Sequence, residues 1–456
     1  MKKRLFLLAS ILILIFTVAQ NANAQWVETG LTDSANVQAL TVVGANTSSP
    51  MLFAGSFVFP GRQPGGVYLS TDSGTTWSHV GLIGVAVNSF AEIGANTSSP
   101  MLFAGASEDP PFIYGGGVYL TTNNGSSWNE SDAGISDPHV FSLAVLGASA
   151  SSPLIFAGTY YGGVFFSTNK GKTWTAVNNG LTAMANGSPV VPGVWGLAVS
   201  GADGSPQTLF AETSFGIYRT TNNGVSWEQT STGLPDTANT RINALTVSDS
   251  NASPPTLMAG TTNHGVFLST NNGISWSASN GGSTNIGTAS ISGFAVSGTN
   301  VFTGGGDSVF LSTNNGALWT VVNPGASFLV GPLTLCGPYL CAASHSAGAP
   351  VRRRLLSQMI NPSGVEPTPE SIDSRLDAYP NPFSQSTTIS FTTSESGVAT
   401  VAIVNILGVT VARIFSGELD AGTHTFTWDA RGLPAGMYEC IVHMNGKVER
   451  TAMVVN

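Results

Sequence analysis

Short runs of alternating apolar and polar residues recur along most of the chain and predict β-strands rather than helices. The run from Gly66 to Leu69 is typical, because it leads into an octapeptide that ends in Trp77. Two further apolar strands precede it, from Ala39 to Val42 and from Leu52 to Gly55, and the tryptophan opens a fourth. This order returns about every 49 residues, and four short strands in a repeat of that length are typical of a β-propeller blade.

The octapeptide occurs six times, with Asp or Asn at its third position, Gly at its fifth and Trp at its eighth. The Asp or Asn side chain can accept backbone N–H groups across a turn, and the glycine can adopt the positive φ that such a turn needs. One copy is acidic and five carry Asn, which favours a structural turn over a calcium site. These residues are Asp72, Gly74 and Trp77; Asn123, Gly125 and Trp128; Asn169, Gly171 and Trp174; Asn222, Gly224 and Trp227; Asn271, Gly273 and Trp276; and Asn314, Gly316 and Trp319.

The octapeptide resembles the Asp-box, or BNR, repeat of sialidases, sortilin-type receptors and related proteins. The resemblance implies a β-propeller in which each box forms a turn and its tryptophan plugs the edge of a blade. It does not imply an activity, because one fold hosts many functions.

The last repeat is incomplete in an informative way. A seventh unit contains three strands, the last from Val351 to Leu355, but it has no octapeptide and no fourth strand. The segment from Gln25 to Gly30 matches the strand that follows each octapeptide, with Trp26 in the position of the tryptophan. We therefore predict a seven-bladed β-propeller over residues 25–361, closed by the N-terminal strand. The arginine run 352–354 in the seventh unit is expected to face solvent.

The chain changes character after Ile360. Residues 362–376 are rich in Pro and polar side chains and are expected to form a linker. From Asp377 to Asn456 alternating strands return without the octapeptide, and this length predicts a small immunoglobulin-like β-sandwich. The fold class is therefore all-β throughout.

Several motifs appear in order in residues 377–456, and their residues include Tyr379, Pro380, Asn381, Pro382, Phe383, Gly408, Gly422, Gly436 and Tyr438. These motifs resemble the type A C-terminal sorting domain of the type IX (Por) secretion system of Bacteroidota and relatives. The resemblance implies that this segment engages the secretion machinery, that the protein crosses the outer membrane, and that a surface protease usually removes the domain.

The N-terminus has the three parts of a signal peptide. Lys2 to Arg4 is basic, Leu5 to Val18 is an apolar run of 14 residues, and Ala22 to Ala24 has the small-x-small cleavage pattern. We expect residues 1–24 to be removed between Ala24 and Gln25. No later apolar stretch reaches the ~20 residues of a transmembrane helix, so no membrane span is expected.

Charge and cysteine content exclude some functions and leave others open. The formal net charge is −9 and 9% of the residues are charged, so there is no electrostatic reason to bind nucleic acid. Three cysteines are too few for a disulfide framework. Cys336 and Cys341 could pair across a hairpin or remain buried thiols, and Cys440 would be left over.

Aromatic residues collect in the loops that a propeller presents on its ligand-binding face. With few charges among them, they would suit a glycan or a peptide, although each could instead cover a neighbouring blade. The candidates are Phe57, Phe59, Arg62, Phe112, Tyr114, Tyr160, Tyr161, Trp195 and Phe215.

Enzyme chemistry is less well supported. The arginines do not form the cluster that a sialidase uses to hold a carboxylate, and no motif pairs two carboxylates as a glycosidase requires. The histidines lack ligand spacing, so neither a metal nor a cofactor is expected. We therefore expect a secreted or cell-surface binding scaffold, with a secreted glycoside hydrolase as the alternative. The loop carboxylates and histidines considered are Glu108, Asp109, Asp132, Asp137, Glu212 and Asp236, with His79, His139, His264 and His345.

Overall fold

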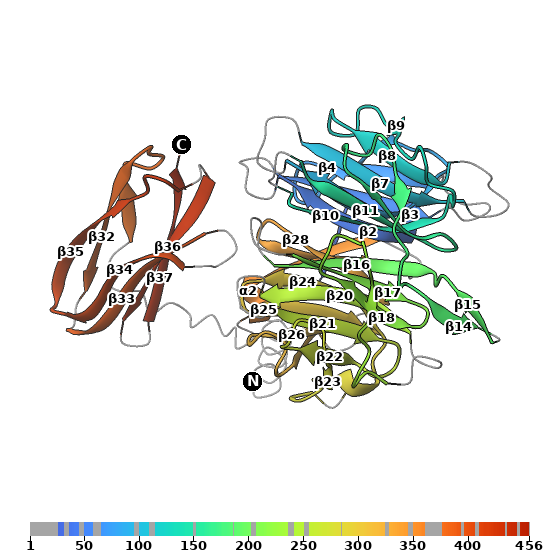
Figure 1. Cartoon of the computed structure of the whole chain (residues 1–456). Coiled ribbons are helices and arrows are strands. Elements are labelled where there is room, and N and C mark those ends of the chain that lie inside the picture. The colour runs from blue at the N-terminus through green and yellow to red at the C-terminus, as the bar shows by residue number, and fades with distance from the viewer. Residues whose placement is uncertain are drawn as a thin grey trace, which may run out of the picture.

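The structure is a computed structural model in which the chain folds into an N-terminal ring of sheets and a C-terminal sandwich (Figure 1). The predicted signal peptide, with Ala24 and Gln25, lies outside the described residues, as does most of the predicted linker. The described residues are 26–31, 36–44, 50–57, 65–94, 100–108, 115–148, 152–185, 187–201, 207–235, 241–249, 255–283, 285–323, 328–344, 350–360, 376–393, 396–405, 410–433, 436–444 and 447–455.

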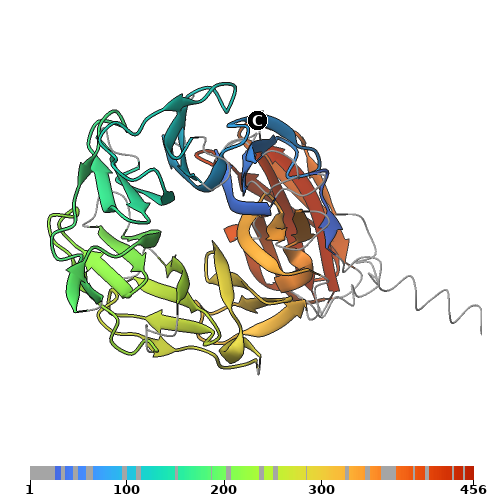
Figure 2. The same cartoon turned by 90° about the vertical axis from the view of Figure 1, so that its right-hand side faces the viewer.

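Seven antiparallel four-stranded sheets make up the ring within this described part of the chain, and in six of them the strands follow chain order. The first strands of neighbouring sheets contact one another all the way round, so they line the axis of the ring (Figure 2). The first four sheets are β2 (Asn36–Val43), β3 (Met51–Phe57), β4 (Gly66–Ser70) and β5 (Ser78–Gly81); β6 (Ala86–Ile93), β7 (Met101–Ser107), β8 (Gly117–Thr121) and β9 (Asn129–Glu130); β10 (Val140–Leu146), β11 (Leu154–Thr159), β12 (Gly163–Ser167) and β13 (Thr175–Ala176); and β16 (Val194–Ser200), β17 (Thr208–Thr213), β18 (Gly216–Thr220) and β19 (Glu228–Gln229).

The remaining three sheets complete the ring, and a few short elements decorate it. A two-stranded hairpin, β14 (Ala183–Ala185) and β15 (Ser188–Val190), lies between the third and fourth sheets. A 3₁₀ turn, η1 (Ile286–Thr288), and a short helix, α2 (Ser357–Ile360), are also present. The fifth to seventh sheets are β20 (Ile242–Asp249), β21 (Thr256–Thr261), β22 (Val266–Ser269) and β23 (Ser277–Ala278); β24 (Ile291–Ser297), β25 (Asn300–Gly305), β26 (Ser308–Ser312) and β27 (Thr320–Asn323); and β28 (Val330–Cys336), β29 (Tyr339–Ser344), β30 (Val351–Leu355) and β1 (Val27–Glu28).

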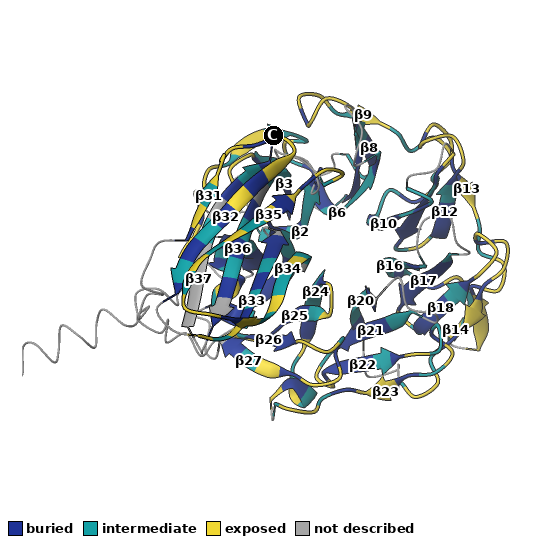
Figure 3. Ribbon diagram, turned by 90° about the vertical axis from the view of Figure 1, so that its left-hand side faces the viewer, coloured by how far each residue is buried: buried dark blue, intermediate teal, exposed yellow. Residues whose placement is uncertain are grey.

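The packed interior of the ring lies between neighbouring sheets, whereas the outer turns are exposed (Figure 3). Phenylalanines from the second strands, such as Phe53, Phe156 and Phe210, are fully buried there. Each lies under the octapeptide glycine of a following sheet, since a Cβ added at Gly224 would approach Phe156 to 3.4 Å. The glycine therefore serves both the positive φ of the turn and the close approach of two sheets.

Each octapeptide forms the same turn and bonds to the preceding sheet. In the second sheet the Asn123 Oδ1 accepts the Ser127 amide at 2.9 Å, and the Gly125 amide donates to the Thr121 hydroxyl at 2.9 Å. The indole nitrogen of Trp128 donates to the carbonyl of Val80 in the first sheet at 3.2 Å. Equivalent bonds from Trp174, Trp227 and Trp276 repeat this link around the ring.

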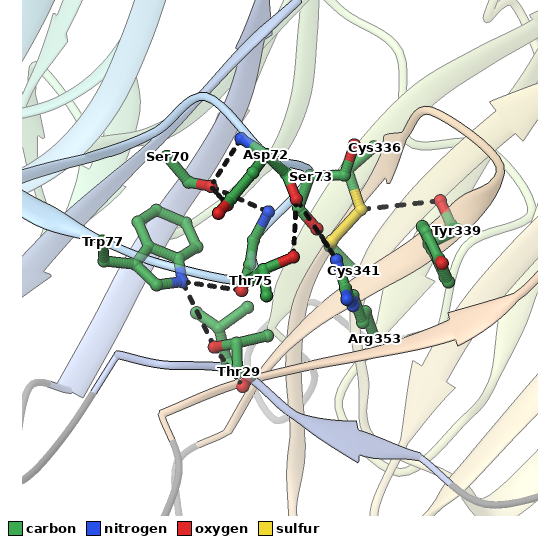
Figure 4. Close-up of a disulfide and its surroundings, with 12 residues drawn as sticks. Thr29, Ser70, Asp72, Ser73, Thr75, Trp77, Cys336, Tyr339, Cys341 and Arg353 are labelled. Atoms are coloured by element: carbon green, nitrogen blue, oxygen red, sulfur yellow. Dashed lines mark hydrogen bonds between the residues drawn. A yellow bond between two sulfur atoms is a disulfide. The ribbon is translucent and has the colours of Figure 1, made fainter.

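The seventh sheet contains the N-terminal strand as its outer member. β1 pairs with β30, and Val27 lies opposite Arg353. The Thr29 hydroxyl donates to the Val351 carbonyl at 2.8 Å and accepts the Trp77 indole nitrogen at 3.2 Å (Figure 4). The two ends of the ring therefore share hydrogen bonds with the first octapeptide.

Cys336 and Cys341 form a disulfide across the β28–β29 hairpin, with their Cα atoms 6.0 Å apart (Figure 4). Both cysteines are buried and pack against Leu52 of the first sheet. Cys440 is a buried free thiol in the C-terminal part.

The expectation that the arginine run faces solvent is wrong. Arg352 and Arg354 are 8% and 6% exposed, because they share the face of β30 that packs against Val322 of the sixth sheet and against Phe328. Their guanidinium groups donate to a Glu28 carboxylate oxygen at 3.2 Å and to the Val322 carbonyl at 3.0 Å. Burial lowers the pKa of Arg354 below its ordinary value. Arg354 therefore joins the seventh sheet to the sixth, whereas Arg352 bonds to β1 within its own sheet.

The C-terminal part is a sandwich of a three-stranded and a four-stranded sheet. The two sheets enclose one apolar core that includes Phe391, Trp428 and Tyr438. This arrangement agrees with the predicted all-β class and immunoglobulin-like sandwich. The strands are β31 (Asp377–Tyr379), β32 (Ser386–Thr393), β33 (Gly397–Asn405), β34 (Thr410–Leu419), β35 (Gly422–Asp429), β36 (Gly436–Met444) and β37 (Lys447–Val455).

Candidate functional site

The first strand of most sheets begins with a β-bulge, and the extra residue lies on one rim of the ring. In three sheets this residue is polar and bonds to the next first strand. Asn88 Nδ2 donates to the Val140 carbonyl at 3.1 Å, and Ser292 Oγ donates to the Val330 carbonyl at 2.7 Å. Asn243 makes the same kind of bond. A bulge residue thus links its sheet to the next sheet along the rim.

In the third and fourth sheets the bulge residues, Phe141 and Trp195, are aromatic. Together with Tyr160, Tyr161 and Arg241 they form what we call the rim cluster. The ring centroids of Phe141 and Trp195 are 4.9 Å apart, and Tyr160 lies 4.8 Å from Trp195. Tyr161 is 4.3 Å from Tyr160 and 71% exposed. The Arg241 guanidinium carbon lies 3.9 Å from the centroid of a Trp195 ring. The cluster is therefore continuous across three sheets.

A buried carboxylate holds the turn that carries the two tyrosines. Asp137 accepts the backbone amides of Tyr161 and Gly162 on one oxygen, and His139 Nδ1 lies 2.8 Å from the other. Burial by itself would raise the pKa of Asp137, but these hydrogen bonds outweigh it and lower the pKa below its ordinary value. Both oxygens are committed to the protein, so Asp137 positions the turn.

A second buried carboxylate, Glu212, stands where five of the other sheets have glycine. The second strands of five sheets carry glycine at this position because a Cβ there would lie closer than 3.0 Å to the Val or Ile that begins the next first strand. At Gly158, for example, the added Cβ would be 2.6 Å from Val194 Cγ1. These glycines are Gly55, Gly105, Gly158, Gly260 and Gly304.

The surroundings of Glu212 are adapted to its side chain. Its pairing partner on β16 is Gly196, where an added Cβ would lie 2.5 Å from Glu212 Oε2. Phe210, two residues earlier on the same strand, packs into the core with Ile242 of the fifth sheet. Because alternate strand residues share a face, Glu212 also points toward the fifth sheet. Arg241 directly precedes β20, the first strand of that sheet.

Glu212 is neutral at neutral pH. Its side chain belongs to a residue that is 3% exposed, and burial raises its pKa to about 8, although the charge of Arg241 opposes the shift. No described side chain or backbone amide donates a hydrogen bond to this carboxyl group. A neutral acid with no partner in the described protein lies beside the rim cluster.

The structure brings together part of the predicted aromatic rim. Tyr160, Tyr161 and Trp195 are in contact, whereas Phe57 ends β3 in the first sheet and Phe215 lies in the turn between β17 and β18. The predicted residues Phe59, Arg62, Phe112 and Tyr114 lie outside the described residues.

Sequence reasoning missed Phe141 and gave no ligand-binding role to Arg241 or Glu212. The signal for Glu212 was visible, because the series Leu-Phe-Ala-Gly becomes Leu-Phe-Ala-Glu at 209–212. Phe141 carried no such signal, since its place depends on the bulge in β10.

The other carboxylates and histidines do not join the site. Glu108 and Asp132 lie in the second sheet and its following turn, while Asp109, Asp236 and His345 lie outside the described residues. Within the described ranges, no three His, Cys, Asp or Glu side chains gather in a way that could hold a metal ion.

The sorting motif ties the two ends of the C-terminal sandwich together. Asn381 Oδ1 accepts the Val454 amide at 2.8 Å, and the Phe383 amide donates to the Val454 carbonyl at 2.9 Å. The Phe383 and Tyr438 rings contact Trp428 at 5.5 and 5.2 Å. Of the three motif glycines, Gly422 and Gly436 have positive φ and Gly408 lies outside the described residues, while Pro380 and Pro382 follow cis bonds and Tyr379 is 81% exposed.

Comparison with known proteins identifies the C-terminal part. Residues 377–456 match the family described as the secretion system C-terminal sorting domain. In the described residues no helix has the length and apolar character needed to cross a membrane. The chain therefore carries a type IX sorting domain and is a secreted or cell-surface protein.

No curated protein matches the chain, whereas several solved structures share its fold. The GH74 xyloglucanase of Xanthomonas campestris is 15% identical over 81% of this chain, with a TM-score of 0.52, and the chain spans 60% of that enzyme. A GH74 enzyme of Niastella koreensis is 15% identical, with a TM-score of 0.53 and coverage of 94% and 74% of the two chains.

A protein of another kind is equally similar. The extracellular domain of a protein described as a one-component system from B. thetaiotaomicron is 10% identical, with a TM-score of 0.52 and coverage of 83% of this chain and 45% of that one. Identities this low show the β-propeller fold alone, and both enzymes and other proteins carry it.

Proposed function

We propose that the protein is a secreted or cell-surface binding protein whose β-propeller takes a glycan at the rim cluster. The observation that carries this proposal is a set of polar groups that the described protein leaves unused. The Trp195 indole nitrogen, the Tyr160 and Tyr161 hydroxyls and the Arg241 guanidinium donate no hydrogen bond to any described residue. Aromatic faces with a few convergent polar groups are typical of ligand sites.

The proposed domain organisation follows the sequence prediction. A signal peptide covers residues 1–24, the seven-bladed propeller 25–361, the linker 362–376 and the sorting domain 377–456. The position of the last ring element, α2 (Ser357–Ile360), and of the first sandwich strand, β31 (Asp377–Tyr379), supports these boundaries.

Replacement of Trp195 tests the binding site. Trp195→Ala removes the ring that Phe141, Tyr160 and Arg241 all contact, so we expect glycan affinity to fall at least about tenfold, equivalent to about 1.4 kcal/mol. A glycan array followed by calorimetry on the positive glycans measures the change. The control is Ile274→Ala, an exposed apolar residue in the fifth octapeptide, which should bind as the unchanged protein does. Equal affinity in the two variants would contradict the proposal.

Glycoside hydrolysis is the second candidate because Glu212 has the raised pKa of a general acid. A glycosidase also needs a second free carboxylate, and Asp137, which holds the turn of the rim cluster, is occupied by backbone amides and His139. Release of reducing ends from a bound polysaccharide, lost in Glu212→Gln, would favour hydrolysis over binding.

A further inference from the structure

Arg241 differs from the other described arginines of the propeller in what its side chain contacts. Arg219 pairs with Glu228, and Arg352 pairs with Glu28. Arg353 and Arg354 donate to backbone carbonyls. The Arg241 guanidinium carbon lies over the Trp195 ring, 3.9 Å from its centroid, and the group makes no ion pair with a described carboxylate. Its charge and the N–H groups at its edges are therefore available to a ligand.

Glu212 does not neutralise Arg241 while it carries a proton. The strands that flank Glu212, β16 and β18, contribute Arg219 as their charged residue, and Arg219 is already paired with Glu228. From the fifth sheet, Arg241 is the charged group that acts on Glu212. Asp137, on the third-sheet side of the rim cluster, is held by backbone amides and His139. Among the described residues, the rim cluster therefore presents one positive charge without an ion-pair partner, close to the half-buried Tyr160 and the exposed Tyr161.

We propose that the glycan is acidic: a uronic acid carboxylate binds the Arg241 guanidinium, and the sugar ring packs on Tyr160 and Tyr161. This inference rests on the proposed function and names the class of ligand. A guanidinium stacked on an aromatic ring keeps its planar edge free for bidentate contact with a carboxylate. The planes of the Tyr160 and Tyr161 rings are nearly perpendicular, at 88°. One sugar ring could therefore stack on the face of one tyrosine and contact the other tyrosine with its edge. An acidic peptide lacks a rigid ring for that corner.

Glu212 acts as a positioning residue in this site. In its neutral form Glu212 carries no charge to pair with the Arg241 guanidinium, which is then available to bind the ligand. When it ionises, its negative charge attracts the same guanidinium and competes with the ligand for it. Since burial raises the pKa of Glu212 to about 8, ligand affinity should be constant below neutral pH and fall as pH rises from 7 to 9. Uronic acid carboxylates stay ionised over this range, so the ligand itself does not titrate.

The experiment measures binding of the full mature chain by calorimetry at pH 7 and pH 9. The probes are oligogalacturonate, oligoalginate and hyaluronan oligosaccharides, each beside its carboxyl-reduced neutral form. We expect at least one acidic probe to bind at least tenfold more tightly than its reduced form at pH 7, and to lose at least threefold in affinity at pH 9. Arg241→Gln should abolish the preference for the acidic form.

Glu212→Gln separates the positioning role from a structural one. The amide is neutral at every pH and similar in size, so the variant should bind as tightly at pH 9 as at pH 7. Circular dichroism shows whether it folds. A drop at pH 9 of the same size in Glu212→Gln would overturn the role of Glu212.

The outcomes distinguish this inference from the proposed function. If neutral glycans bind as well as acidic ones, and Trp195→Ala abolishes that binding, the ligand class is wrong and the proposed function stands. If acidic peptides bind and no glycan does, the acidic-glycan inference is overturned. If no glycan of either kind binds, both proposals fail.

Discussion

Glu212 is the side chain at which the chain departs most clearly from its own repeat. A glycine is required at this position in five other sheets by the apolar residue that begins the next first strand. The buried glutamate costs stability whenever it is ionised, and Gly196 opposite it is shaped to its carboxylate. A residue that breaks a steric rule at such a cost is expected at a functional site.

The dependence of stability on pH tests the state of Glu212. With a folded pKa of about 8 and an ordinary value of 4.5 in the unfolded chain, the folded state holds a proton that the unfolded state releases between these pH values. Stability should therefore fall as pH rises from about 5 to 8, by at most about 1.4 kcal/mol per pH unit, and level off above. Glu212→Gln should lack this slope. Urea unfolding of both proteins at pH 5, 6.5 and 8 measures the difference, and parallel curves would show that Glu212 titrates normally.

The aromatic rim shows how far single residues could be predicted from the sequence. Tyr160, Tyr161 and Trp195 were assigned to the ligand face from the repeat pattern, and they are in contact. Phe141 and Glu212 could not be placed in the same way. Their positions depend on a bulge register and on burial against the next sheet, and both are set by pairing between strands distant in the sequence.

Among the turns, the octapeptide is the element that the sequence predicted best. The bonds that form its turn are local, because each joins residues two to four positions apart. The bulges and the β14–β15 hairpin were not predicted, since a bulge is an irregularity of pairing and leaves no local pattern. The strand order within each sheet followed from the repeat.

The second octapeptide offers a test of the structural role of its polar residue. Asn123→Ala removes the acceptor for the Ser127 amide and the Thr121 hydroxyl, and it should cost about 1 kcal/mol in the free energy of unfolding. Asn123→Asp should cost less than about 0.5 kcal/mol, because the Ser127 hydroxyl can donate where it now accepts. Asp72 already makes this reversed bond with Thr76 in the first octapeptide. Chemical denaturation measures both, and an aspartate variant as unstable as the alanine variant would contradict this account.

The ring is closed by contacts between residues that are far apart in the sequence. Its ends meet where β1 pairs with β30, where the disulfide packs on Leu52, and where Arg353 Nη1 donates to the Ser73 carbonyl at 2.6 Å. The sequence predicted the strand exchange from the missing outer strand of the last repeat. It did not predict that the arginines are buried, because their burial follows from packing against the sixth sheet.

Thr29 lies at the junction between the two ends of the ring. Substitutions at Thr29 test whether this junction holds the ring closed. Thr29→Val keeps the shape of the side chain but removes the hydroxyl that donates to the Val351 carbonyl and accepts the Trp77 indole nitrogen. The Val351 carbonyl keeps the Thr29 backbone amide and the Trp77 indole nitrogen keeps the Gly74 carbonyl, so the loss of the hydroxyl should cost about 1 kcal/mol. Thr29→Ser, which keeps the hydroxyl, should cost less.

The effect of Thr29→Val should also be local, because the remaining sheets keep their own contacts. Hydrogen exchange should become faster first in β1, β30 and the first octapeptide, while the third to fifth sheets stay protected. Glycan binding at the rim cluster should then be retained, since that cluster lies in the third to fifth sheets. If exchange instead accelerates equally in every sheet, the ring opens as one cooperative unit, and closure by the N-terminal strand governs the stability of the binding site as well.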